Sequence, residues 1–453
     1  MDNQQDFFGT EPLGKLLRNQ AVPAAIGIMV MSVYGIVDTI FVGLWVGSLG
    51  IAAITVVLPI TFLVASIGMG IGVGGASIIS RAFGEGDDNK AFRTFGNQVL
   101  LSLLLNIIFI CLGFIFIEEI LSLFGGRGDV QEPAVTYFFF VLLGVPFLGW
   151  AMMSNNVIRA EGYPRTAMLI LIIPAVVNTI LDPIFIVWLD MGIAGAAWAT
   201  SISYMVSATF SVWFFLKGGS KMKLGKKYLT PDMPLIKETL SLGSVTFARQ
   251  GTISLLSVVL NNSLFFYGGE MGLSIYGIIS RLLFFVNFPV LGITQGFVPI
   301  VGYNYGAKMM DRVARLIKIA ITSATLISLV IFSILMIFAP HIISIFTNNE
   351  SLIEQTTPAL RRVFLLTPLL AINLLGSAYF QAIGKVRPAL ILSLSKQGFL
   401  LIPLVFLLPT QFGLNGIWIS FPLADLGAAL ITIYYLKYSN KHTYNRLADS
   451  GNA

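Results

Sequence analysis

Residues 70–84 read GIGVGGASIISRAFG, and 222 positions further on residues 292–306 read GITQGFVPIVGYNYG. Their first, fifth and last positions are glycine in both stretches. The same shift, with no gap, aligns residues 50–165 with residues 272–387. It also pairs Arg93 with Arg315, Glu132 with Glu354, Pro146 with Pro368, Gly162 with Gly384 and Arg165 with Arg387. Glycine, proline and charge mark turns and helix ends, so two unrelated apolar stretches would not agree in this way. The chain is predicted to hold two copies of one unit.

The composition places both copies in a lipid bilayer. Of the 453 residues, 56% are hydrophobic and only 11% are charged, and the mean hydropathy is +0.84. A soluble protein cannot bury so large an apolar fraction, whereas a bilayer solvates it. The sequence therefore predicts an integral membrane protein.

Twelve apolar runs are long enough, at about 20 residues or more, to cross roughly 30 Å of hydrocarbon. They are too uniformly apolar to be the alternating strands of an outer-membrane barrel. We therefore expect an all-α protein with twelve transmembrane helices. The runs lie near residues 22–45, 51–79, 95–117, 135–158, 166–188, 193–216, 242–267, 272–301, 319–340, 360–383, 388–408 and 415–436.

The basic residues gather in alternate loops. Most of the 28 Lys and Arg residues lie before the first run, after the even-numbered runs or at the tail, while the opposite loops hold only Arg127, Arg361 and Arg362. By the positive-inside rule both termini are cytoplasmic and the protein is a multi-pass protein of the cell (inner) membrane. The net charge of +6 is then a topology signal, and we expect no nucleic-acid partner.

Each copy has six spans, an even number, so the second copy enters the membrane from the same side as the first. We expect two six-helix lobes related by a pseudo-two-fold axis along the membrane normal, with a cleft between them. The predicted N-terminal lobe is residues 1–217, and the C-terminal lobe is residues 238–453. Residues 218–237, the longest polar stretch, form a cytoplasmic basic linker.

Two acids lie within apolar runs, where a charge costs at least about 2.5–3.5 kcal/mol at the bilayer centre. Asp38 follows Tyr34 by four residues, and Asp182 follows Asn178 by four, so each pair shares one helical face. Together these groups can share a proton or ligate a small hard cation through oxygen. The alternative is that each Asp only caps a helix broken at a nearby Pro or Gly. We favour the functional interpretation.

Three basic residues also lie in or near apolar runs: Arg249, Arg281 and Lys396. Arg249 and Arg281 can pair with Glu270, with polar backbone in the cleft or with an acidic ligand. An Arg near a span end usually extends its side chain to the interface, and this is the favoured interpretation of Arg249. For Arg281 and Lys396 a place in the cavity stays open.

Several motifs give the whole chain a family resemblance. They are VDTIFVG at residues 37–43, RAFGEG at 81–86 followed by Arg93, RAEG at 159–162, Asn178 with Asp182, and GYNYGA at 302–307. With twelve spans in two repeated halves, the chain resembles the MATE (multidrug and toxic compound extrusion) family, in its prokaryotic multidrug-efflux group.

The resemblance implies a secondary antiporter that alternates between two open forms and exports organic, mostly cationic, compounds in exchange for H⁺ or Na⁺. It implies no cofactor, and we expect a monomer. The coupling site that it implies lies in the N-terminal lobe, with Na⁺ or H⁺ at Asp38, Asn178 and Asp182. Its further members are Tyr34, Asn155 or Asn156, and Thr200, and Pro23 is the first-span proline linked to helix bending.

One departure from the family pattern concerns the C-terminal lobe. Other members carry acids in the seventh and tenth spans, where this chain offers Asn261, Asn262 and Asn373. This departure argues against a second cation site in that lobe.

Two other functions are alternatives. A flippase for lipid-linked oligosaccharide or peptidoglycan precursors needs a cationic cavity, which the three basic residues can supply. An intramembrane aspartyl protease can use Asp38 and Asp182 as a dyad, but neither acid has a Tyr-Asp or Gly-x-Gly-Asp setting. No phosphate-binding glycine loop with a following Lys occurs, and His341 and His442 lie outside any ligand cluster. The chain is predicted to be a secondary transporter and not an enzyme.

Overall fold

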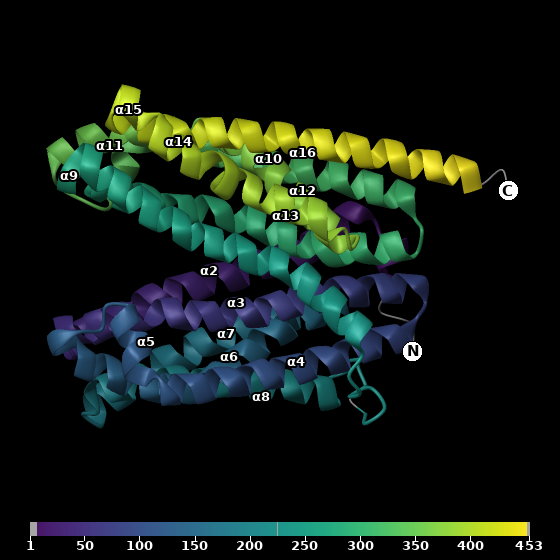
Figure 1. Ribbon diagram of the computed structural model, residues 1–453, viewed down its shortest axis with the longest axis horizontal. Coiled ribbons are helices and arrows are strands. Elements are labelled where there is room, and N and C mark those ends of the chain that lie inside the picture. The colour runs from purple at the N-terminus through teal and green to yellow at the C-terminus, as the bar shows by residue number, and fades with distance from the viewer. Residues whose placement is uncertain (1–6, 224, 451–453) are drawn as a thin grey trace. The chain divides into compact units, whose positions relative to one another are not determined.

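The computed structural model describes residues 7–223 and 225–450, with side chains as far as residue 438. Every regular element in these residues is a helix (Figure 1). The helices of the first half of the chain are α1 (Phe7–Thr10), α2 (Leu13–Trp45), α3 (Ser48–Glu85), α4 (Asp88–Ile115), α5 (Ile117–Leu123), η1 (Gly128–Val130), α6 (Gln131–Ala160), α7 (Pro164–Asp182), η2 (Pro183–Trp188) and α8 (Gly192–Lys217).

The second half continues in the same way. Its helices are α9 (Met233–Gly306), α10 (Met310–Ser344), α11 (Glu350–Val363), η3 (Thr367–Leu369), α12 (Leu370–Ala382), α13 (Val386–Leu394), η4 (Ser395–Leu401), α14 (Ile402–Leu407), α15 (Pro409–Phe412) and α16 (Leu414–Ser450). The segments η2 and η4 are π-helical.

Eleven helical stretches of the described residues are long and apolar enough to cross a membrane. One of them, α9, has 74 residues and contains two spans, because Gly269 leaves helical geometry at φ 59° and ψ −152°. A residue with positive φ cannot continue a right-handed helix, and glycine adopts that conformation without steric cost. The predicted all-α fold with twelve spans is confirmed.

Contacts divide the chain into two compact units. The first comprises Met1–Phe247 and Gly302–Met310, and the second comprises Ala248–Val301 and Asp311–Ala453. In the first unit α6 packs against α3 and α8, α2 packs against α7, and the core includes Val57, Phe138 and Leu142. The second unit has its own core around Phe364 and Trp418. The predicted lobe boundaries at residues 217 and 238 remain a prediction.

The last residues of the two stretches that define the repeat meet within the first unit. A Cβ atom on Gly84 would clash with the carbonyl oxygen of Tyr303, and one on Gly306 would clash with that of Arg81. The shift of 222 positions relates Gly84 to Gly306 and Arg81 to Tyr303, so the contact is reciprocal. Glycine is required on both sides because backbone lies directly against backbone.

The end of the first unit that holds this crossing also holds the connection between α8 and α9, and we call it the linker side. It is formed by the turns at residues 86–87 and 161–163 and by the connection at residues 218–232. Helix α9 begins at Met233, inside the predicted linker. Asp232 caps this helix by accepting a hydrogen bond from the Leu235 amide at 3.4 Å, and Pro234 lies in its first turn.

Candidate functional site

Two buried carboxylates meet in the first unit. Asp38 on α2 is 7% exposed, and Asp182 at the end of α7 is fully buried. They are 144 positions apart in the sequence, but the packing of α2 on α7 brings Asp38 within interaction distance of both Asp182 and Asn178. We call Asp38, Asn178 and Asp182 the acid cluster. Pro183 begins the π-helical segment η2 directly after Asp182.

The acid cluster holds acceptors that lack donors. Asn178 Nδ2 donates a hydrogen bond to Thr200 Oγ1 at 3.3 Å. The other buried oxygens, namely one of Asp38, that of Asn178 and both of Asp182, have no hydrogen-bond partner among the described residues. Buried acceptors of this kind are costly, and a proton or a small cation would satisfy them. Carboxylate and amide oxygens are suitable ligands for a hard cation, so the residues fit H⁺ or Na⁺.

Three tyrosines surround the acid cluster. Tyr34, Tyr137 and Tyr204 each interact electrostatically with Asp38, and Tyr137 also contacts Thr200. Sequence reasoning identified Tyr34 and Thr200 but missed the other two. Tyr204 follows Thr200 by four residues on α8, so helical spacing could have pointed to it.

No basic side chain neutralises the acid cluster. Among the residues that the structure describes, the ion pairs involve neither Asp38 nor Asp182. Within the described residues the acid cluster therefore has no basic counter-charge.

Two of the predicted site residues lie elsewhere. Asn155 Nδ2 donates to the Ala167 carbonyl at 2.5 Å, and Asn156 Nδ2 donates to the Met152 carbonyl of its own helix at 2.9 Å. Asn155 lies 18 residues beyond Tyr137 on α6, which is about 27 Å along a helix. The structure therefore does not bring Asn155 or Asn156 to the acid cluster, because α6 carries them to its opposite end.

Pro23 lies inside α2, fifteen residues before Asp38, and α2 continues through it from Leu13 to Trp45. It lacks the amide that would bond to the preceding turn, so it weakens the helix that carries Asp38. The structure places Pro23 on the acid-bearing helix but does not test its role in bending.

In the second unit, the predicted cavity cation Lys396 has a partner that sequence reasoning missed. Lys396 Nζ lies 2.5 Å from Asp425 Oδ1, and the Asp425 side chain is only 6% exposed. The sequence could have pointed to Asp425, because this acid lies inside the apolar run at residues 415–436 just as Asp38 lies inside the first apolar run. Arg281 is exposed and Arg249 is half-buried, and within the described residues neither forms an ion pair.

Asn373, which stands where acids were sought in the tenth span, joins three helices. Its Nδ2 lies within hydrogen-bond distance of the Leu392 carbonyl at 3.1 Å, Ser395 Oγ at 3.0 Å and Thr432 Oγ1 at 3.2 Å. It therefore ties α12 to α13, η4 and α16.

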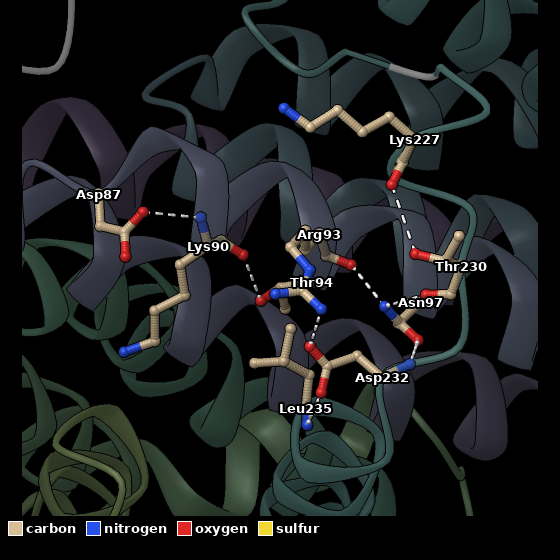
Figure 2. A network of polar contacts seen from close by, with 9 residues as sticks. All are labelled: Asp87, Lys90, Arg93, Thr94, Asn97, Lys227, Thr230, Asp232 and Leu235. Atoms are coloured by element: carbon tan, nitrogen blue, oxygen red, sulfur yellow. Dashed lines mark hydrogen bonds and ion pairs between the residues drawn. The ribbon is translucent and has the colours of Figure 1, made fainter.

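On the linker side, the connection to α9 is bound to α4 (Figure 2). Arg93 forms an ion pair with Asp232 at 2.6 Å. Asn97 donates to the Thr230 carbonyl at 3.3 Å and accepts from the Asp232 amide at 2.8 Å. Figure 2 shows these groups converging from α4 and the connection. The polar stretch expected to be a linker is thus packed against the first unit.

A buried acid binds the other end of this connection. Glu161, in the turn between α6 and α7, is 1% exposed and accepts hydrogen bonds from the Ser220 hydroxyl at 2.7 Å and the Met222 amide at 3.0 Å. Burial raises the pKa of Glu161 to about 7, although these donors and Lys221 act in the opposite direction. Sequence analysis noted this residue only as part of a motif.

The chain is similar to proteins of known families along nearly its whole length. The MatE family model matches residues 23–184 and 244–407. The multidrug export protein MepA of Staphylococcus aureus (strain NCTC 8325 / PS 47) is 29% identical over 439 residues, covering 96% of this chain and 97% of that protein. MepA of Staphylococcus saprophyticus is also 29% identical, over 441 residues with the same coverage.

Solved structures agree with this similarity. An outward-facing conformation of a multidrug resistance MATE family transporter of the MOP superfamily has a TM-score of 0.92 and 25% identity, covering 98% of this chain and 99% of that one. A MATE crystal structure in the bent conformation has a TM-score of 0.93 and 25% identity, covering 99% of both chains. The family model spans well over half of the sequence, and the twelve-span fold agrees with it, so the chain belongs to the MatE family of membrane transporters.

Proposed function

We propose that this protein is a secondary multidrug exporter that expels organic, mostly cationic, compounds in exchange for H⁺ or Na⁺. The relatives of similar length are named multidrug export proteins. The observation that carries the ion-exchange part is the acid cluster, in which two buried carboxylates lie together with donor-free oxygens and no basic partner among the described residues.

In this proposal the acid cluster binds the coupling ion. Asp38 and Asp182 share a proton or ligate Na⁺, Asn178 adds an amide oxygen, and Thr200 holds that amide in place. Loading the cluster releases bound drug and permits the return to the other open form. Coupling requires that the ion bind one conformation more tightly than the other, because equal binding shifts no equilibrium.

The conformational part of the proposal concerns the linker side, which we take to be cytoplasmic by the positive-inside rule. On this side the backbones at Gly84 and Gly306 lie directly against each other within the first unit. The lobes would be residues 1–217 and 238–453, with Pro23 bending the helix that carries Asp38, in a protein that acts as a monomer.

The alternative flippase function loses support from the second unit. It relied on three cationic side chains, and Lys396 is neutralised by Asp425. The protease alternative has no feature that favours it over transport in a chain of this family.

The test is dye transport by purified protein in liposomes. Ethidium transport is measured under an imposed pH gradient, with and without sodium, for the parent protein and for Asp38→Asn. We expect a gradient to drive transport by the parent and not by Asp38→Asn, because a neutral amide cannot take up and release the ion. Thr39→Val is the matched control, since its hydroxyl bonds only to the Gly35 carbonyl of the same helix. Transport by Asp38→Asn at the parent rate would refute the assignment.

A further inference from the structure

The Lys396–Asp425 ion pair is enclosed within the second unit. Asp425 lies on α16, Lys396 lies on the π-helical segment η4, and their side chains are 6% and 17% exposed. A buried carboxylate without a counter-charge is costly, so the ammonium at 2.5 Å supplies what the site needs.

Among the described residues, no other ion pair involves Lys396 or Asp425. Lys396 is the charged group that acts on Asp425. On α11, Arg362 bonds to Asn415, which is ten residues before Asp425 on α16, or about 15 Å along the helix. The segment η4 also touches Thr252 of α9 through Gly398, one helical turn beyond Arg249. The remaining charged side chains of the helices in this unit that pack around α16 and η4 are Glu270 and Arg281 of α9, Glu350, Glu354 and Arg361 of α11, and Arg387 of α13.

In the order of spans Lys396 corresponds to Asp182, while Asp425 lies in the following span. Asp182 lies in the fifth span of the first copy, directly before the π-helical segment η2. Lys396 lies in the fifth span of the second copy, within the π-helical segment η4. Single-turn π segments frequently accompany functional sites. The first copy leaves its carboxylates without a cation, whereas the second copy carries a cation on its own chain.

We propose that Lys396 is a tethered cation that occupies the place a small cation, H⁺ or Na⁺, would take on Asp425. It thereby confines ion coupling to the acid cluster of the first unit. This inference rests on the proposed ion-coupled function. It predicts that removal of the ammonium turns Asp425 into a cation site.

The test measures cation binding by thermal unfolding rather than transport. Lys396→Met is made in an Asp38→Asn, Asp182→Asn background, which removes the acid cluster as a source of signal. The Tm of the purified protein is compared in sodium and potassium chloride at equal ionic strength, and at pH 6 and pH 8. We expect sodium or acid to raise the Tm of Lys396→Met, because a ligand that binds only the folded state stabilises it.

Three controls identify the site. The background protein and Lys396→Arg keep a tethered cation beside Asp425. The third control combines Lys396→Met with Asp425→Asn and so removes the carboxylate. In none of the three should sodium or acid raise the Tm as it does for Lys396→Met alone. Lys396→Gln, whose amide can still donate to Asp425, is measured in parallel in case Lys396→Met does not fold. A folded Lys396→Gln or Lys396→Met with no Asp425-dependent response to sodium or acid overturns the inference. That result would leave the Asp38→Asn transport test untouched, so the two proposals fail separately.

Discussion

The acid cluster and the Lys396–Asp425 pair meet the same difficulty, a carboxylate buried in a membrane helix, in opposite ways. The acid cluster has two carboxylates and no base among the described residues, whereas the pair has one carboxylate and one base. Both lie outside the aligned repeats at residues 50–165 and 272–387, which share glycines, prolines and turn-forming charges. The aligned repeats thus share the residues that set helix ends and turns. The two copies differ in the charged groups that lie outside the aligned residues. A site that exchanges an ion must lack a permanent counter-charge, and among the described residues the acid cluster meets this condition whereas the Lys396–Asp425 pair does not.

The largest change in stability is expected for substitution of Asp425. Asp425→Asn leaves the Lys396 ammonium buried beside a neutral group, and loss of one partner of a buried pair costs about 3–5 kcal/mol. We expect a clear fall in Tm, smaller if Lys396 extends its long side chain toward the interface. Thermal unfolding in detergent is the measurement. Adding Lys396→Met should restore much of the loss, because a neutral pair needs no counter-charge. An Asp425→Asn variant as stable as the parent would mean that the ion pair contributes nothing.

Glu161 is a fourth buried acid among the described residues, and it lies outside the spans and accepts hydrogen bonds from nearby donors. Its pKa is about 7 in the folded protein against an ordinary value of 4.5. The folded protein therefore keeps the proton to higher pH than the unfolded chain. The stabilisation that this provides is present below pH 4.5 and is lost as the pH rises through 7. One pKa unit corresponds to about 1.4 kcal/mol, so the loss is about 3 kcal/mol.

Glu161→Gln should remove that part of the pH dependence, since an amide does not titrate. Between pH 5 and pH 8 we expect the parent to lose more stability than Glu161→Gln, as measured by thermal unfolding at each pH. Glu85→Gln serves as the control, because it removes an exposed carboxylate on the same linker side and should keep the slope of the parent. Equal slopes for the parent and Glu161→Gln would exclude Glu161 as the titrating group.

The sequence predicts the twelve membrane spans and the proximity of Asp38 and Asp182. Apolar runs of membrane-spanning length leave few alternatives to helices, and an acid inside such a run needs a polar partner. The two acids inside apolar runs are paired on this ground, and the family resemblance implies the same two residues. The irregular residue Gly269 lies between residues 267 and 272, the interval that separates the seventh and eighth predicted spans, so the sequence located this break although the helix around it is continuous.

The depth and partners of single polar residues were harder to predict. Asn155 and Asn156 are adjacent in sequence to buried positions, but a few turns of α6 carry them about 27 Å from the level of Tyr137. Lys396 and Asp425 lie on different helices, 29 positions apart, so no spacing rule connects them. The polar residues at 218–237 predict a cytoplasmic basic linker, but a sequence does not show that Asn97 and Glu161 bind the backbone of this stretch.

The smallest expected effect concerns the stability of the acid cluster itself. Asp38→Asn removes one of two adjacent unpaired carboxylates and supplies an amide donor to Asp182, both of whose oxygens lack a donor. A hydrogen bond to a charged group contributes about 1.5–3 kcal/mol, and we expect the lower end because the amide must also be positioned. Thermal unfolding at pH 8 should therefore show Asp38→Asn to be slightly more stable than the parent, while Thr39→Val stays unchanged. The opposite signs for Asp38→Asn and Asp425→Asn would separate a carboxylate kept for ion exchange from one kept in a permanent pair. A loss of stability in Asp38→Asn would instead indicate that Asp38 has a structural partner, and the distinction between the two units would fail.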